Sequence, residues 1–386
     1  MIADRVGLFD SNNIHELVWP DTAQANRVKR IMAPVIKEGV GQFIKNVESQ
    51  VKVMIVGHKV FPVVVEAGGL QSHVGSLYGH YVVAACDEAR KFANQFIRRA
   101  AQSFSSISGT YFWKGILSRN VQIDNWLVTT NLHDEISAED VASIVNFLRS
   151  HYPDRAIIVR SLTKYIDEDI MLALKRSKFS FIASRQIYIW DYRKSQTFSI
   201  KARHALRKDD ALASQAGYEW VDLDISKQDN VLRVLDLYRY LYLEKHSWNN
   251  PQYTEAFIRT LCAKPDGFLR IKVMIKKDRI DGFIGYYVNR ATLTAPFIGY
   301  DTTLSQKDGL YRMLMSKLRQ EAKEQNLVLN GSAGAGEFKR TRGGESITEF
   351  FAIYDQHLSW YYRAQWFLLR QIMNTFGMSV LRANVL

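Results

Sequence analysis

The sequence has 386 residues, of which 47% are apolar, 12% aromatic and 23% charged. That length suffices for two domains with cores of their own, and the composition excludes a chain that is disordered throughout. The two cysteines, Cys86 and Cys262, are too few for a disulfide scaffold or a four-cysteine zinc site, and their apolar helical surroundings favour the core. The longest apolar runs are too short to cross a bilayer and the first residues do not resemble a signal peptide, so we expect a cytoplasmic protein without a membrane span.

The positive charge is concentrated in the second half of the chain. The formal net charge is +12, and residues 1–180 hold 21 basic and 18 acidic residues, whereas residues 181–386 hold 30 and 21. An excess of this kind favours an anionic partner for the second half, such as a nucleotide cofactor, an acidic carrier protein, tRNA or a membrane surface. Simple solubility is the alternative explanation.

The first half is predicted to alternate strands and helices after a mostly helical segment at 1–50. Two β-branched runs around Gly57 predict a hairpin. Ser137 is a suitable N-cap for a helix that opens with acidic residues. The predicted strands are 51–56, 61–65, 124–130, 155–162 and 181–192, and the predicted helices are 80–101, 137–151 and 167–178.

The second half repeats this pattern without repeating the sequence. Helices are predicted at 231–244, 251–263, 309–325 and 358–376, and strands at 268–276, 280–289, 291–300, 327–332 and 349–354. Residues 200–225 form the predicted boundary between the halves. The aromatic run 360–367 predicts core packing or a dimer face, and the tyrosines near 238–242 and 286–287 predict core rather than a ligand pocket.

Residues 294–312 are a strand, a turn and the start of a helix. The N-terminus of a helix has free N–H groups and a partial positive charge, so it can bind a phosphate or pyrophosphate. Gly309 would let a ligand approach the backbone, and Lys307 and Arg312 add positive charge. An ordinary strand–turn–helix connection is the alternative.

A glycine-rich basic segment follows the next strand. Residues 331–344 hold five glycines and three cations, Lys339, Arg340 and Arg342. Glycines free the backbone to wrap a ligand, and the cations can pair with phosphate or carboxylate oxygens. This combination favours an anion-binding loop over a solvated basic loop.

These two segments resemble known acyltransferases. The run Gln-x-x-Gly-x-x-Arg that begins at Gln306 resembles the acyl-donor signature of the GNAT superfamily. Gln306 and Gly309 match that signature, although Tyr311 stands where the family has a small residue. The segment 334–343 is similar to a loop of Fem-type peptidyltransferases and their bacterial acetyltransferase-like relatives, in which Lys339 matches the lysine.

The resemblance implies an α/β (α+β) fold of two tandem GNAT-like domains, each a mixed, mostly antiparallel sheet flanked by helices. We expect a helical segment at 1–50, a degenerate GNAT-like domain at 51–205 and a GNAT-like acyltransferase domain at 206–386. The segment 130–135 of the first domain has two acids and no glycine, so this domain should not bind the donor.

The activity implied is N-acyl transfer to an amine or amino acid, with acyl-CoA or the phosphopantetheine of an acyl carrier protein as the donor and no metal. The donor would lie between two diverging strands, held by Tyr300, Gln306, Lys307, Gly309, Leu310, Tyr311, Arg312, Ser332 and Arg342. Lys339 would stabilise the oxyanion, a phosphate or the leaving group.

The catalytic base is the least determined part of the predicted site. Asp301 is either the proton acceptor or a turn-capping residue. His246 is either a base or part of a capped helix connection, and His357 is either a base near Lys339 or a structural histidine. The nine histidines are too scattered for a metal site.

Two other functions remain open. A Fem-type ligase would use aminoacyl-tRNA, and its phosphate contacts would extend over the basic residues Arg193, Lys194, Lys201, Arg203, Arg207 and Lys208. A binding protein with a decayed site is favoured weakly by Tyr311, and the Lys339 loop argues against it.

Overall fold

The computed structural model describes residues 6–84, 113–263 and 268–377. They form two compact units, each drawn from separate stretches of the chain. Of the described residues, unit 1 comprises 6–84, 113–184, 247–253 and 350–377, and unit 2 comprises 185–246, 254–263 and 268–349. The chain passes between the units within two strands, β6 (Ser180–Asp191) and β12 (Glu345–Tyr354), and on either side of the segment 247–253.

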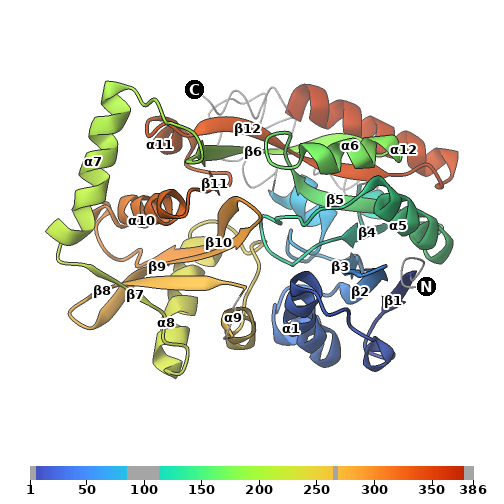
Figure 1. Cartoon of the computed structure of the whole chain (residues 1–386), viewed down its shortest axis with the longest axis horizontal. Helices are drawn as coiled ribbons and strands as arrows, with labels where there is room; N and C mark the ends of the chain where they lie inside the picture. The colour runs from blue at the N-terminus through green and yellow to red at the C-terminus, as the bar shows by residue number, and fades with distance from the viewer. Residues whose placement is uncertain (1–5, 85–112, 264–267, 378–386) are drawn as a thin grey trace. The chain divides into compact units, whose positions relative to one another are not determined.

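Unit 1 is a mixed sheet with helices on it (Figure 1). Four strands form an antiparallel run, β5 pairs in parallel with β4, and the end of β12 pairs antiparallel with β5. The strands are β1 (Val6–Phe9), β2 (Gln50–Val56), β3 (Lys59–Val65), β4 (Asn120–Ile123) and β5 (Ala156–Leu162), and the helices are α1 (Ala23–Glu38), α5 (Ala138–His151), α6 (Glu168–Arg176) and α12 (Trp360–Ile372).

Unit 2 has the same order of pairing. Four strands are antiparallel, β11 pairs in parallel with β10, and the end of β6 pairs antiparallel with β11. The strands are β7 (Glu219–Asp222), β8 (Arg270–Lys276), β9 (Arg279–Asn289), β10 (Thr292–Tyr300) and β11 (Val328–Asn330), and the helices are α7 (Ile200–Gln215), α8 (Gln228–Tyr238), α9 (Glu255–Cys262), α10 (Leu310–Glu324) and α11 (Gly336–Arg340). The expectation of a repeated, mostly antiparallel sheet flanked by helices is confirmed.

Local sequence signals explain many of these elements. Ser137 and Asp140 form a reciprocal capping box at the start of α5. The hairpin around Gly57 is β2–β3, with Val56 opposite Lys59. Tyr286 and Tyr287 are buried, with 1% of each residue's surface exposed, as expected for core residues. Cys262 is half-buried, and burial raises the pKa of its thiol to about 12.

Three expectations differ from the structure. Residues 124–130 are not a strand, because Asp124 and Leu127 have left-handed backbone φ angles of 53° and 59°. Strand β1 lies within the segment predicted as helical. Helix α7 occupies the region 200–225, for which the sequence predicts only a domain boundary. The remainder of the predicted helix 80–101, with Cys86, lies outside the described residues.

Candidate active site

The site in unit 2 starts where strands β10 and β11 part. Their parallel ladder has three residue pairs, from Thr292–Val328 to Thr294–Asn330. Strand β10 then bulges between Thr294 and Phe297 and runs on to Tyr300 along β9. The chain after β11 turns instead toward β6, where Gly331 N donates to Tyr188 O at 2.8 Å. The edge of β10 beyond Thr294 is thereby released from β11, at the place where the resemblance to acyltransferases implies the donor.

The loop after β10 ends in an uncapped helix. The φ angle of Gly309 is +73°, a left-handed conformation that suits glycine, and no side chain caps α10. The first helical hydrogen bond runs from Met313 N to Gly309 O at 3.1 Å. The amides of residues 310–312 therefore precede the helical ladder, and the N-terminus of the helix can attract an anion.

Of the predicted donor-binding residues, Gln306 and Lys307 are exposed on this loop. Leu310 is buried, and it packs with Met313 in the core beneath the helix. Tyr311 lies among aromatic rings, with its centroid 5.1 Å from that of Phe338 and 6.5 Å from that of Tyr300. Tyr311 thus makes apolar contacts, and burial raises the pKa of its hydroxyl.

Arg312 and Arg342 meet at one buried acid on α7. Asp209, which is 1% exposed, accepts from Arg312 Nε at 2.7 Å and pairs with the Arg342 guanidinium. Asp209 joins α7 to the start of α10 and to the end of the glycine-rich loop. A phosphate bound by either arginine would have to compete with this carboxylate.

Lys339 supports the glycine-rich loop from inside. Its ammonium is 2% exposed, and it donates to the carbonyl oxygens of Gly331, Ser332 and Ala333 at 2.7, 3.2 and 2.8 Å. Burial and the charge of Arg185 lower the pKa of Lys339 to about 7, while the three acceptors match the three N–H donors of the charged form. The loop is therefore folded around this lysine.

The glycines of this loop make room for aromatic side chains. A methyl group on Gly331 or on Gly344 would lie 2.7 Å from the Trp190 ring, and one on Gly336 would collide with Tyr188. At Gly343 it would collide with Phe198. At Gly334 alone of these five no atom lies within 4 Å. Most of the glycines therefore serve packing, whereas the sequence suggested that they wrap a ligand.

Asp301 is held as a carboxylate at the end of β10. Arg233 donates to its Oδ2 at 2.7 Å, and the Thr303 hydroxyl and amide donate to its Oδ1 at 2.5 and 3.0 Å. Burial raises the pKa of Asp301, but the hydrogen bonds from Thr303 and Arg233 outweigh it, so the pKa is lowered. A carboxylate of low pKa anchors a turn better than it removes a proton.

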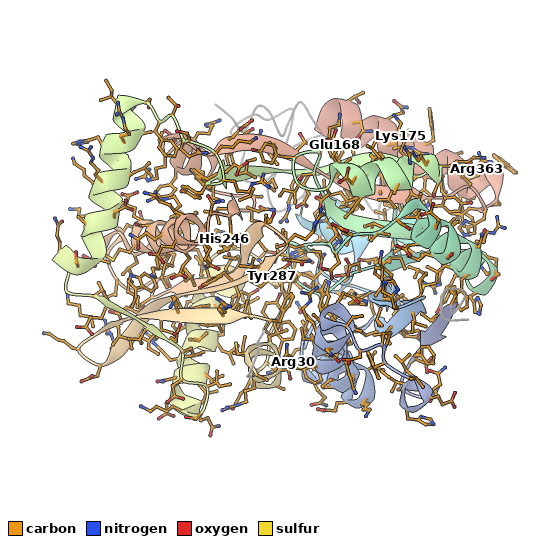
Figure 2. All side chains as sticks on the ribbon, in the orientation of Figure 1. Arg30, Glu168, Lys175, His246, Tyr287 and Arg363 are labelled. Atoms are coloured by element: carbon orange, nitrogen blue, oxygen red, sulfur yellow. The ribbon has the colours of Figure 1, made fainter. Side chains whose placement is uncertain are left out.

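The two candidate histidines lie in different units. His246, labelled in Figure 2, is exposed in unit 2, and its ring centroid is 6.1 Å from that of Tyr242. His357 belongs to unit 1, where its Nε2 lies 2.9 Å from Arg155 O and 3.3 Å from Tyr152 O. Burial lowers the pKa of His357. The contacts of His357 are with the α5–β5 connection, which fits the structural alternative.

Sequence reasoning missed the contribution of α7. Asp209 and Leu212 project onto the loop and helix that the donor signature predicts, and Asp210 accepts from Arg319 at 2.8 Å. The signal was present, since two consecutive acids follow a basic run there. Within the described ranges no group of histidine, cysteine and acidic side chains could hold a metal ion. No described helix is long and apolar enough to span a membrane.

The chain is similar to several solved structures, each at low sequence identity. Solved structures to which the chain is similar include the C-terminal domain of a putative lysylphosphatidylglycerol synthetase from Agrobacterium fabrum, at 11% identity and a TM-score of 0.46, over 66% of this chain and 81% of that one. L-PGS from Bacillus licheniformis is 15% identical with a TM-score of 0.43, over 60% of this chain and 77% of that one. FemX is 10% identical with a TM-score of 0.42, over 57% of this chain and 78% of that one.

No curated protein matches the sequence. The sequence identities to these solved structures are low, and their TM-scores stay below 0.5. Residues 201–340, which include β10, the Gly309 loop, α10 and α11, match the family described as an acetyltransferase (GNAT) domain. Over residues 201–340 the chain is therefore similar to GNAT acetyltransferase domains, and the protein is a transferase.

Proposed function

We propose that unit 2 transfers an acyl group from a pantetheine thioester, on coenzyme A or on a carrier protein, to a small-molecule amine. The observation that carries this proposal is the short parallel ladder between β10 and β11. An extended arm that bears amide groups can pair with the edge of β10 that β11 leaves after Thr294. The domain family of residues 201–340 supports the same reaction class.

The start of α10 is the proposed place for the donor phosphates. The amides of residues 310–312 lie before the first helical hydrogen bond, and the left-handed Gly309 precedes them with Leu212 packed against it. Lys307 is exposed beside them, whereas Arg312 and Arg342 are already paired with Asp209. Backbone amides and Lys307 therefore account for most of the proposed attraction.

The chemistry requires a deprotonated amine, a stabilised oxyanion and a protonated leaving thiolate. The amine attacks the thioester carbonyl, the C–N bond forms, and the C–S bond breaks as the tetrahedral intermediate collapses. The hydroxyl of Tyr300, at the end of β10 and 3.3 Å from Lys245 Nζ, is our candidate proton donor to the thiolate. His246, the residue after Lys245, is our candidate base, since imidazole titrates near neutral pH.

The test is calorimetric titration of coenzyme A into wild-type protein and two charge-reversal variants. Lys307→Glu places an anion beside the helix N-terminus and should weaken coenzyme A binding about tenfold, while pantetheine without the nucleotide should bind as before. Lys323→Glu, at the far end of α10, is the matched control. Equal loss in both variants, or no binding of coenzyme A or of a phosphopantetheinylated carrier protein, would contradict the proposed donor site.

A second candidate is transfer from aminoacyl-tRNA, and the observation that favours it is the outer face of α7. Lys201, Arg203, Arg207 and Lys208 are all exposed there, while Leu206 and Asp209 are buried. The same face could receive an acidic carrier protein. tRNA binding that falls steeply with salt, together with no response to coenzyme A, would favour the tRNA-dependent reaction. All of these donors are cytoplasmic, and we propose that compartment for the reaction.

A further inference from the structure

Helix α12 of unit 1 carries a concentration of exposed aromatic and aliphatic side chains. Four of the eleven large apolar side chains that are exposed among the described residues lie on it: Trp360, Tyr361, Phe367 and Leu368, at 79%, 51%, 57% and 45%. The opposite face holds Trp366 and Leu369, which are at most 1% exposed and belong to the core of unit 1. The helix is thus docked by one apolar face and presents a second one to solvent.

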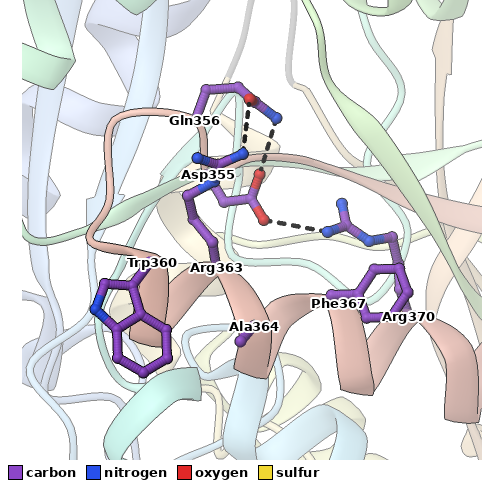
Figure 3. A pocket seen from close by; sticks show the side chains of 7 residues that line it. All are labelled: Asp355, Gln356, Trp360, Arg363, Ala364, Phe367 and Arg370. Carbon is purple, nitrogen blue, oxygen red and sulfur yellow. Dashed lines mark hydrogen bonds and ion pairs between the residues drawn. The ribbon is translucent and has the colours of Figure 1, made fainter.

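A shallow hollow of about 310 Å³ lies between the start of this helix and the residues before it (Figure 3). Trp360, Arg363, Ala364 and Phe367 line it from positions that share one helical face. Arg370 pairs with the buried Asp355 at 3.2 Å, so that carboxylate is already neutralised. Arg363 makes a long contact of 3.5 Å with Gln356, and its charge stays at the surface.

The charge of α12 indicates which kind of partner can cover its exposed face. From Gln356 to Gly377 the described chain contains two arginines and neither aspartate nor glutamate, and because Arg370 is paired with Asp355, Arg363 carries the exposed charge of the helix. A second copy of the chain packed by twofold symmetry would bring Arg363 toward its own copy with no exposed acid on the helix to balance it. A partner for this face must combine an apolar interior with an anionic surface.

We propose that α12 is a membrane-surface contact, with Trp360, Tyr361, Phe367 and Leu368 entering the interfacial region of a bilayer that contains anionic lipid. Tryptophan and tyrosine favour the boundary between headgroups and acyl chains, and Arg363 would meet the lipid phosphates. The helix lies on the surface in this arrangement and does not cross it. This contact is independent of the acyl donor that unit 2 uses.

The experiment is sedimentation of the full chain with vesicles of phosphatidylcholine alone or of phosphatidylcholine with phosphatidylglycerol. The wild type should bind the anionic vesicles, and Trp360→Ala with Phe367→Ala should lower its partition coefficient about tenfold or more. Arg363→Glu should lower it about fivefold or more on anionic vesicles and leave binding to phosphatidylcholine unchanged. Because these side chains are exposed, the variants should keep the thermal unfolding midpoint of the wild type.

Two control variants match these changes in chemistry and exposure. Ile200→Ala removes a side chain that is also 79% exposed, on α7, and Lys175→Glu reverses an exposed charge on α6. Neither should alter vesicle binding. The proposal is overturned if the wild type does not bind anionic vesicles, if the α12 variants bind as the wild type does, or if Trp360→Ala abolishes self-association or the binding of an acidic protein while vesicle binding is absent.

Discussion

Single buried charges determine local structure at two places in this protein. Lys339 holds three carbonyl oxygens of the glycine-rich loop in unit 2. In unit 1, His133 lies between Asp124 Oδ2 at 2.7 Å and Arg160 O at 2.6 Å, with both ring nitrogens facing acceptors. Burial disfavours the charged imidazole, but the hydrogen bond and charge of Asp124 outweigh it and raise the pKa of His133 to about 9. The histidine is therefore a buried cation at neutral pH.

The His133–Asp124 pair predicts a pH-dependent stability. The pKa is about 9 in the folded protein and 6.5 ordinarily, so the stabilisation is complete below pH 6.5 and is lost as the pH rises through 9. Asparagine tolerates the left-handed backbone at residue 124, so Asp124→Asn tests the charge alone. It should lower the free energy of unfolding by about 3 kcal/mol at low pH and by less as the pH approaches 9. Urea unfolding across this range measures the difference.

The control for this prediction is Asp169→Asn, which removes an exposed carboxylate at the start of α6. It should leave the pH dependence of unfolding as it is in the wild type. A difference between Asp124→Asn and the wild type that stays constant from pH 6.5 to 9 would show that the histidine carries no charge in the folded state.

At the scale of elements, the contact between α7 and α10 controls the proposed donor loop. Gly309 has a φ of +73°, and a methyl group there would lie 2.7 Å from Leu212 Cδ2. Gly309→Ala should therefore cost about 1–2 kcal/mol and should weaken coenzyme A binding as well. Adding Leu212→Ala removes the collision but not the backbone strain, so the double variant should recover donor binding in part. Unfolding and titration of the same samples measure both effects.

Gly41→Ala provides the comparison, because no atom lies within 4 Å of the added methyl group and the backbone there is not left-handed. It should change neither quantity. If Gly309→Ala binds coenzyme A as the wild type does, the loop does not approach the donor.

Several elements were predictable because their signals are local. Helix α10 and the meander β8–β10 follow from apolar periodicity and turn residues, and α5 follows from its capping box. The strand predicted at 124–130 failed because Asp124 and Asn125 favour turns, a signal that the apolar run after them obscured. For α7, the basic run suggested a linker, and the buried acid Asp209 does not follow the usual apolar pattern.

The partners of the site residues were less predictable than its position. The Gly309 loop could be located because its turn residues are neighbours in the chain. The divergence of β10 and β11 was instead implied by the resemblance to GNAT acyltransferases, since the paired residues lie far apart in the chain. Sequence reasoning could not show that Arg312 and Arg342 share Asp209, because those contacts join residues 103 and 133 positions apart. It also could not show that Lys339 faces inward, although the carbonyl groups that accept from it are close in the chain. Local patterns give the type of a side chain and not its partner.

At the scale of the whole molecule, each unit contains the end of a strand that comes from the other half of the sequence. The end of β12, from the C-terminal part of the sequence, completes the sheet of unit 1, and the end of β6, from the N-terminal part, completes that of unit 2. No local periodicity encodes this exchange of strand ends. The division at residue 205 remains a prediction about domains, whereas the compact units divide the chain within β6, within β12 and on either side of residues 247–253.

The exchange predicts that neither half folds alone. A fragment 1–195 lacks Phe351, Ile353 and Trp366, which are buried in the core of unit 1, and a fragment 196–386 lacks Tyr188 and Trp190 of the core of unit 2. Each fragment should show no cooperative thermal unfolding, and the two co-expressed should purify together and unfold cooperatively. Circular dichroism melts of both fragments and of their complex decide this, and a fragment 1–195 that melts cooperatively would contradict it.

The glycine-rich loop has a consequence for how this sequence can change during evolution. At four of its five glycines, even the smallest side chain would strike Tyr188, Trp190 or Phe198, so a point mutation there survives selection only if the aromatic neighbour shrinks as well. Position 334 has no such neighbour, and its left-handed φ of +76° is the remaining restriction, which asparagine can meet. Descendants of this chain should therefore drift at residue 334 long before they drift at residues 331, 336, 343 and 344.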